Sequence, residues 1–281
     1  MILVFGSTGQ VARSLADLAG DRTLHHLPRS QADLSDPDAC AAWIRQHRPA
    51  AVINAAAYTA VDRAEDEEAL ALTINGAAPG AMARACAEFG VPFLHVSTDY
   101  VFAGTGDTPH RPGDPVDPQN AYGRTKLAGE QAVRAAGGPH AILRTSWVFS
   151  EYGTNFVKTM LRLSDARDAL NVVDDQIGGP TPARGIAAAL LRMTDALVAG
   201  HNGGTYHYAG APFTSWKCFA RETFDRAGRP VKVAGLPTSD YPTPAKRPLN
   251  SRLDCTSLET DFGIVPPSWT DDLARILKEL L

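Results

Sequence analysis

Three side chains of this sequence have the types and spacing needed to donate a proton to a carbonyl oxygen. Tyr122 and Lys126 are four positions apart, so a helix would place them on one face. An ammonium beside a phenol stabilises the phenolate and lowers the tyrosine pKa from its ordinary value of about 10. Thr98 lies at the carboxyl end of a predicted strand, just after its last residue, and could hydrogen-bond the carbonyl. We predict Tyr122, Lys126 and Thr98 to be catalytic; an ordinary exposed helix pair is the alternative for the first two alone.

A glycine-rich turn near the start of the chain is typical of a dinucleotide-binding site. The segment Gly6-Ser7-Thr8-Gly9-Gln10-Val11-Ala12 joins an apolar strand at 1–5 to a helix predicted over 9–18. Gly6 permits the tight turn, and Gly9 lets the backbone approach a pyrophosphate at the helix N-terminus. A purely structural turn is the alternative. We predict as cofactor contacts Gly6, Thr8, Gly9, Gln10 and Val11.

The residue that follows the second predicted strand bears on which cofactor binds. That strand spans 23–27 and is followed by Pro28 and Arg29, where an NAD site usually carries a carboxylate for the ribose 2′-hydroxyl. A guanidinium suits a 2′-phosphate, so Arg29 favours NADPH, with NADH as an alternative donor. A solvated surface arginine is the other explanation. Asp33 could hold the adenine amine or form a turn.

Small residues follow the third predicted strand, where a cofactor would need close backbone approach. Ala55, Ala56, Ala57 and Tyr58 lie between Asn54 and Thr59. Core packing would explain the alanines alone, but the flanking polar residues favour a ligand-binding segment. We predict cofactor contacts along 55–59.

The elements that must position these residues alternate along the first half of the chain. Apolar strands are predicted at 1–5, 23–27, 51–54, 92–96 and 141–143. Helices are predicted at 9–18, from Asp36-Pro37 onward, at 65–89 with a bend or break at Pro79, and at 120–136. Such alternation predicts an α/β fold with a Rossmann-type, doubly wound parallel sheet.

The second half of the chain is less regular and predicts a smaller, mostly C-terminal α/β substrate-binding domain. Helices are predicted at 154–163, 185–198, 215–227 and 269–281, with a strand at 205–208 and a Pro-rich ordered loop at 236–248. That loop is too long for a linker inside a compact body, which favours a binding role. We place the dinucleotide-binding domain at 1–150 and the substrate domain at 151–281, with some segments returning to the sheet.

Composition and charge exclude several classes of protein. The 281 residues include 44% hydrophobic and 21% charged residues and carry a net charge of -4, which argues against disorder, nucleic-acid binding and an anionic membrane partner. Four scattered cysteines without a CxxC pair favour a reducing compartment, and no apolar run approaches the ~20 residues of a membrane span. Because the first apolar run is also too short for a signal sequence, we expect a cytoplasmic protein.

The motifs together resemble the extended short-chain dehydrogenases/reductases. The resemblance rests on Gly-x-x-Gly-x-x-Ala, Asn-Ala-Ala-Ala, Ser-Thr and Tyr-x-x-x-Lys. Longer strings, among them STDYVFAGTGDTP, YGRTKLAGE, RTSWVF, DDQIGGPT and YPTPAKRPLNSRL, are similar to the dTDP-4-dehydrorhamnose reductase family from about residue 1 to about residue 275. This resemblance implies NADPH-dependent reduction of the C4 ketone of dTDP-4-dehydro-L-rhamnose, the last step to dTDP-L-rhamnose.

The resemblance also implies roles for individual residues. Tyr122 would protonate the forming alkoxide, Thr98 would polarise the carbonyl and Lys126 would tune Tyr122. Further cofactor contacts carried over by position are Asp33, Leu34, Ala57, Tyr58, Thr59, Tyr122 and Lys126. The residues implied to hold the nucleotide sugar are Thr98, Asp99, Tyr122, Trp147, Asn155, Arg247 and Asn250.

Physical arguments bear on two of these substrate residues. Arg247 could donate two parallel hydrogen bonds to a diphosphate, with a surface salt bridge as the alternative. Trp147 offers a flat apolar wall for a deoxysugar, with a core tryptophan as the alternative. We expect no metal, because the carboxylate that some relatives use on the first helix to bridge a dimer is missing from Val11–Leu15. A monomer and a homodimer both remain open.

Two other functions compete with the reductase. A nucleotide-sugar 4,6-dehydratase would carry an Asp-Glu pair after the threonine, but Asp99 is followed by Tyr100. A 4-epimerase holds NAD permanently, which Arg29 disfavours. A non-catalytic subunit that binds NADP(H) would not need Thr98, Tyr122 and Lys126 intact.

Overall fold

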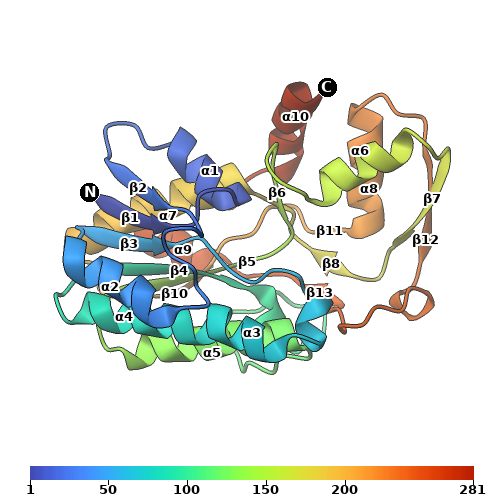
Figure 1. The fold of residues 1–281 in the computed structure, drawn as a ribbon. Helices are drawn as coiled ribbons and strands as arrows, with labels where there is room; N and C mark the ends of the chain where they lie inside the picture. The colour runs from blue at the N-terminus through green and yellow to red at the C-terminus, as the bar shows by residue number, and fades with distance from the viewer.

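A six-stranded, fully parallel sheet forms the centre of the computed structural model, which describes all 281 residues (Figure 1). Its strand order is β10-β5-β4-β3-β1-β2, so the chain reverses its direction of travel between β1 and β3. This confirms the predicted α/β, Rossmann-type fold class. Ligands of such sheets bind at the carboxyl ends of the strands beside that reversal. The strands are β1 (Ile2–Phe5), β2 (Leu24–Leu27), β3 (Ala51–Asn54), β4 (Phe93–Thr98), β5 (His140–Thr145) and β10 (Gly203–His207).

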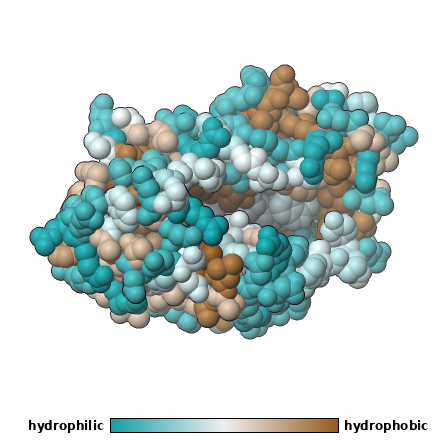
Figure 2. Space-filling model, viewed as in Figure 1, coloured by the Kyte–Doolittle hydropathy of each residue, from teal (hydrophilic) through white to brown (hydrophobic).

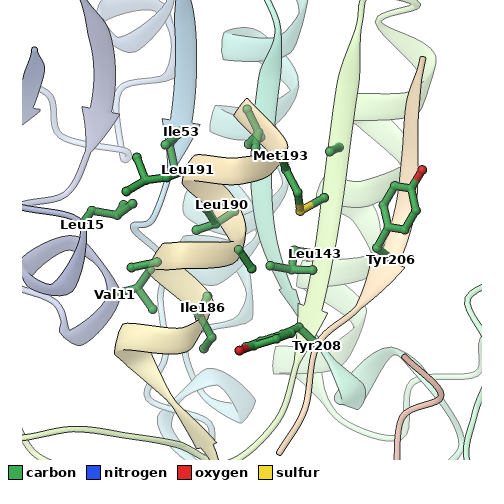
Figure 3. Packing of buried hydrophobic residues seen from close by; sticks show 14 of the residues in the cluster. Val11, Leu15, Ile53, Leu143, Ile186, Leu190, Leu191, Met193, Tyr206 and Tyr208 are labelled. Atoms are coloured by element: carbon green, nitrogen blue, oxygen red, sulfur yellow. The ribbon is translucent and has the colours of Figure 1, made fainter. Parts of the chain in front are cut away.

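Helices cover both faces of the sheet because its strands carry apolar side chains on both sides. Along β1, Val4 packs with α1 (Gln10–Asp17) and α7 (Ala183–Val198), whereas Leu3 packs with α2 (Pro37–His47) and α4 (Ala78–Ala87). Figure 3 shows α7 against the sheet, with Ile186 and Leu190 of the helix pointing toward the strands. α5 (Ala121–Ala135) lies beside α4.

A helical segment covers most of the predicted range 65–89, but its irregularity is not the bend or break expected at Pro79. The structure instead has a short 3-10 turn at Arg63–Glu65, α3 (Glu68–Leu72), a π-helical turn at Thr73–Ala77 and then α4. Pro79 lies in the first turn of α4, where its missing N–H costs little. The π turn therefore takes the place of the break expected at the proline, and it buries Asn75.

A second lobe stands beside the carboxyl ends of the strands (Figure 1). Its core joins Phe149 to α6 (Phe156–Ser164), α8 (Trp216–Arg226) and α10 (Trp269–Leu280). Its short strands, absent from the sequence prediction, are β6 (Val148–Phe149), β7 (Ala169–Val173), β8 (Ile177–Gly178), β9 (Thr181–Pro182), β11 (Thr214–Ser215), β12 (Lys232–Leu236) and β13 (Asn250–Ser251).

The second half of the chain also contributes to the first body. β10 pairs with β5 in the six-stranded sheet, and α9 (Thr256–Phe262) packs beside β10. The Pro-rich segment after β12 is a loop that contains one 3-10 turn at Thr238–Asp240. No helix of this protein combines the length and the apolar character that crossing a bilayer would require.

Candidate active site

A cavity of about 680 Å³ lies at the carboxyl ends of the sheet strands, a size ordinary for a small-molecule site. Figure 2 shows a hollow between the body that carries the sheet and the lobe of α6 and α8. Most residues predicted from the sequence line it. These are Gly6, Thr8, Gly9, Gln10, Val11, Arg29, Asp33, Leu34, Ala55, Ala56, Ala57, Thr59, Thr98, Asp99, Tyr122, Lys126 and Trp147.

The glycine-rich turn presents the free end of α1 to this cavity. Gly6 has φ +104°, and a Cβ there would lie 3.3 Å from the Cβ of Ala56 on the neighbouring segment. Gly9 is the N-cap of α1, with no side-chain cap, and the first helical turn contains no acidic residue. The unpaired N–H groups and positive end of α1 are therefore available to an anion, which fits the pyrophosphate of a dinucleotide.

Arg29 and Asp33 form one exposed ion pair at the rim of the cavity. Arg29 Nε lies 3.0 Å from Asp33 Oδ2, and the arginine side chain is 78% exposed. Asp33 also accepts a hydrogen bond from the Ser35 N–H, and that bond is the main reason why the Asp33 pKa is lowered. A guanidinium held in this way keeps donors free for a 2′-phosphate.

The backbone of the segment that follows β3 is fixed by a residue that the sequence analysis missed. Asn75, on the π turn, accepts a hydrogen bond from the Tyr58 N–H (2.8 Å) and donates one to the Tyr58 carbonyl (3.0 Å). It also donates to the Thr125 hydroxyl on α5. Tyr58 itself points its phenol to Glu67 and is absent from the cavity lining. The sequence offers little signal for Asn75, because the π turn that carries it leaves hardly any trace in hydrophobic periodicity.

Thr98 and Asp99 end β4 inside the cavity. The Thr98 hydroxyl donates to Asp99 Oδ1 at 3.0 Å and accepts a hydrogen bond from the Tyr100 N–H. Burial raises the pKa of Asp99 to about 6, although the nearby Ser251 and Thr98 hydroxyls oppose this in part. Asp99 Oδ2 is buried without a hydrogen-bond partner. The two side chains thus offer a hydroxyl and a carboxyl of near-neutral pKa to a polar ligand.

Tyr122 and Lys126 lie on one face of α5, as predicted, but their electrostatics differ from the prediction. Asn120 begins the helix by accepting a hydrogen bond from the Gly123 N–H. Burial raises the pKa of Tyr122 to about 12, and the nearby Thr98 hydroxyl only partly opposes this. The Lys126 ammonium donates to the Val96 carbonyl (2.8 Å) and faces His95 (3.2 Å). The predicted lowering of the Tyr122 pKa by Lys126 is therefore wrong in this structure, in which burial raises that pKa.

Trp147 forms the wall of the cavity that belongs to the second lobe. Its backbone has φ +49°, rare for an aromatic residue, and its ring stacks on Trp216 with centroids 3.6 Å apart. Gly178 allows this contact, since a Cβ there would lie 2.8 Å from Trp147 Cε2. Trp216 donates in turn to Gln176. This strained and supported ring is positioned to face a ligand in the cavity.

Three residues predicted to hold the nucleotide lie outside the cavity lining. Asn155 caps α6 and donates to Gln10 Oε1 at 3.0 Å. Arg247 donates to Asp62 Oδ2 at 2.8 Å, and its side chain is 20% exposed. Asn250 is buried and donates to the carbonyls of Thr105 and Thr108. All three side chains therefore already make bonds within the protein, and their roles toward a ligand stay predictions.

The fold and the site define a class. The reversal point of a parallel sheet, a glycine turn at the free end of α1, and Thr98 beside a Tyr-x-x-x-Lys pair on α5 describe an extended short-chain dehydrogenase/reductase.

All 281 residues match the model of the RmlD substrate binding domain family, and the chain belongs to this family. It is 43% identical to the dTDP-4-dehydrorhamnose reductase of Sinorhizobium fredii, a match that covers 100% of this chain and 97% of the relative. The chain is therefore an oxidoreductase.

Solved structures agree with this placement. A dTDP-4-dehydrorhamnose reductase from Clostridium acetobutylicum matches with a TM-score of 0.93 and 37% identity, covering 99% of each chain. Another from Bacillus anthracis, solved in complex with NADP, matches with a TM-score of 0.92 and 33% identity over 99% of this chain and 98% of that one.

Proposed function

We propose that the protein reduces the C4 ketone of dTDP-4-dehydro-β-L-rhamnose with NADPH to give dTDP-β-L-rhamnose. This would be the last step in making that nucleotide sugar. The observation that supports it best is that one cavity joins the glycine turn to Thr98, Tyr122 and Lys126. The full-length similarity to reductases that carry this name supports the choice of substrate.

The cofactor would lie along the glycine turn, with its pyrophosphate at the N-terminus of α1 and its adenosine end near Arg29 and Asp33. The NADP complex of the Bacillus anthracis relative supports the choice of NADPH. Bound NADPH supplies the hydride that reduces the sugar ketone. Because Arg29 is the residue that favours NADPH here, Arg29→Ala should reduce kcat/KM for NADPH more than for NADH. Equal losses with the two cofactors would show that Arg29 does not contact the 2′-phosphate.

Tyr122 donates its phenolic proton to the alkoxide that forms at C4. The raised pKa keeps this phenol protonated at neutral pH, so it is ready to act as an acid. Thr98 turns its hydroxyl hydrogen from Asp99 to donate to the same oxygen, and the Lys126 ammonium stabilises the phenolate left on Tyr122. Trp147 packs against the sugar ring and limits water access to the reacting carbon.

Arg247 is proposed to reach the diphosphate of the nucleotide sugar. The prolines around it (Pro242, Pro244 and Pro248) reduce the entropy that the loop loses on ordering, and a guanidinium can donate two parallel hydrogen bonds. Its bond to Asp62 would then be exchanged or shared on binding. Arg247→Ala should raise the KM for the nucleotide sugar far more than the KM for NADPH. Lys246→Ala is the matched control, and an unchanged sugar KM in Arg247→Ala refutes the assignment.

The experiment that tests the function follows NADPH oxidation at 340 nm with the purified keto-sugar and identifies the product by NMR. We expect turnover that depends on both substrates, and a 10²- to 10⁴-fold lower kcat in Tyr122→Phe, as is usual when a general acid is lost. Tyr100→Phe is the matched control, because Tyr100 packs edge-on against Tyr122 with ring centroids 5.4 Å apart. NADPH binding without turnover in the wild type would instead indicate a non-catalytic subunit.

A further inference from the structure

A histidine that no step of the proposed reaction uses lies in direct contact with Lys126. His95 is fully buried in β4, and its Nε2 lies 3.2 Å from Lys126 Nζ. Gly129, one turn after Lys126 on α5, makes room for the Asn75 carbonyl beside the pair: a Cβ there would lie 2.1 Å from that oxygen, but at an ordinary contact distance of 3.5 Å from His95 Nε2.

Asn54, at the end of β3, determines which nitrogen of the His95 ring carries the proton. The side-chain oxygen Oδ1 of Asn54 accepts a hydrogen bond from the Ala56 N–H at 3.2 Å, so the side-chain amide nitrogen faces the ring. That nitrogen lies 3.2 Å from His95 Nδ1 and can only donate. Nδ1 is then the acceptor, and the neutral ring carries its hydrogen on Nε2, which faces Lys126.

An Nε2–H group opposite Lys126 favours the neutral amine of that lysine over its ammonium form. An ammonium has only donors, so it meets Nε2–H unfavourably, whereas a neutral amine accepts the hydrogen bond through its lone pair. The amine still donates to the Val96 carbonyl. Burial lowers the pKa of Lys126 to about 8, and burial together with Lys126 lowers the pKa of His95, so the ring stays neutral.

Other ionisable groups near the pair do not reverse this preference. Glu130, on the next turn of α5, would favour the ammonium, but Arg144 of β5 and Arg134 of α5 both form ion pairs with it. Tyr122 is protonated at neutral pH. The side chain that contacts the pair from β3 is the uncharged Asn54.

We propose that His95 is a positioning residue for Lys126: held by Asn54, it fixes the direction of the amine and sets the pH at which the amine loses its charge. The inference rests on the proposed function for its consequence, because the Lys126 ammonium is what stabilises the Tyr122 phenolate. Above that pH the phenolate loses its partner, and turnover falls.

The kinetic test compares the pH dependence of kcat/KM for the keto-sugar in the wild type and in His95→Gln. The glutamine carbonyl can turn to Lys126 and accept from the ammonium, so the alkaline limb should move upward by about 1 pH unit. The Kd for NADPH, measured by fluorescence, should change less than threefold. Phe93→Leu is the control, since Phe93 stacks beside the His95 ring and has no group that could hydrogen-bond Lys126. The alkaline limb of the pH profile of this variant should not move. An alkaline limb that stays in place or moves downward in His95→Gln overturns the proposal.

A spectroscopic test needs neither turnover nor a substitution at His95. In protein labelled with ¹⁵N-histidine, the ring that shows contacts to Phe93 is His95, and long-range ¹H–¹⁵N spectra report its tautomer. We expect the Nε2–H form, with ring shifts that change between pH 7 and 10 and no longer do so in Lys126→Met. The Nδ1–H form, or ring shifts independent of pH in the wild type, overturns the proposal.

The two tests separate this inference from the proposed function. If the wild type does not reduce the keto-sugar, the proposed function fails, while the ¹⁵N spectra still decide the role of His95. If the wild type turns over but the alkaline limb of His95→Gln does not move, the positioning role fails and the reductase remains.

Discussion

Two successive turns of α5 bury charge in opposite ways. At the turn of Glu130, the carboxylate accepts two hydrogen bonds from the Arg144 guanidinium (2.8 and 2.7 Å) and one each from Ser97 and Arg134. At the turn of Lys126, an equally buried ammonium has a carbonyl oxygen and a histidine ring for partners, and no carboxylate.

The pKa values follow from this difference. Burial alone would raise the pKa of Glu130, but the bonds and charge of Arg144 hold it below its usual value. Burial lowers the pKa of Lys126 to about 8, and Glu130 opposes this only in part. A buried charge that is fully paired therefore has a structural role, whereas a buried charge without a countercharge keeps a pKa near neutrality and can take part in catalysis.

The largest expected loss of unfolding free energy comes from removing the Glu130 carboxylate. Glu130→Gln leaves the Arg144 guanidinium, which is 2% exposed, without a countercharge. Removing one member of a buried pair costs about 3–5 kcal/mol of unfolding free energy. Urea unfolding at pH 7 measures this. Arg134→Gln is the control, since that side chain is 39% exposed and its pair should contribute no more than about 1 kcal/mol. Equal effects of the two substitutions would contradict the distinction.

Removing the unpaired charge of Lys126 should stabilise the protein, whereas removing the Glu130 carboxylate destabilises it. Lys126→Met keeps a chain of similar length without the cost of a buried ammonium, so the unfolding free energy at pH 7 should rise by about 1–3 kcal/mol after the lost bond to Val96 is counted. Turnover should fall sharply in the same variant. Parallel unfolding and NADPH-oxidation measurements check both effects, and a less stable Lys126→Met protein would contradict the interpretation.

The pH dependence sharpens this prediction. The folded pKa of Lys126 is about 8, below its ordinary value of 10.5, so the unfolded chain binds more protons between these values. The wild type should therefore gain stability as pH rises from 8 to 10.5. The advantage of Lys126→Met is full below pH 8 and should shrink across that window. An advantage that stays constant from pH 7 to 10 would show that the lysine charge does not cause it.

The smallest expected loss of unfolding free energy comes from removing the hydrogen bond between Ser97, which lines the cavity, and Glu130. Ser97 lines the cavity and donates to Glu130 Oε1 at 2.6 Å. Ser97→Ala removes one bond to a carboxylate that keeps its two arginines, so the loss of unfolding free energy should be about 1–2 kcal/mol. Thermal unfolding measures it, and Ser97→Thr, which keeps the hydroxyl, is the matched control. A loss as large as that of Glu130→Gln would mean that the arginines do not satisfy the carboxylate.

Much of the fold and cavity could be predicted because the signals are local. The alternation of apolar strands and helices gave the parallel sheet, and Asp36 with Pro37 marked the start of α2. The four-residue spacing of Tyr122 and Lys126 fixed their common helix face. The π turn at Thr73–Ala77 was missed, because a shift of one residue in a helical repeat leaves little trace in hydrophobic periodicity.

The sequence by itself determined which chemical groups the cavity contains and the order of the elements that carry them, because periodicity and turn chemistry act over a few residues. Only the tertiary structure decided which groups neutralise each other. Glu130 and Arg144 meet because α5 packs on β5, and Lys126 meets His95 because α5 packs on β4. Burial and the nearest partner together determine the charge state of an ionisable group, and both follow from packing between distant segments.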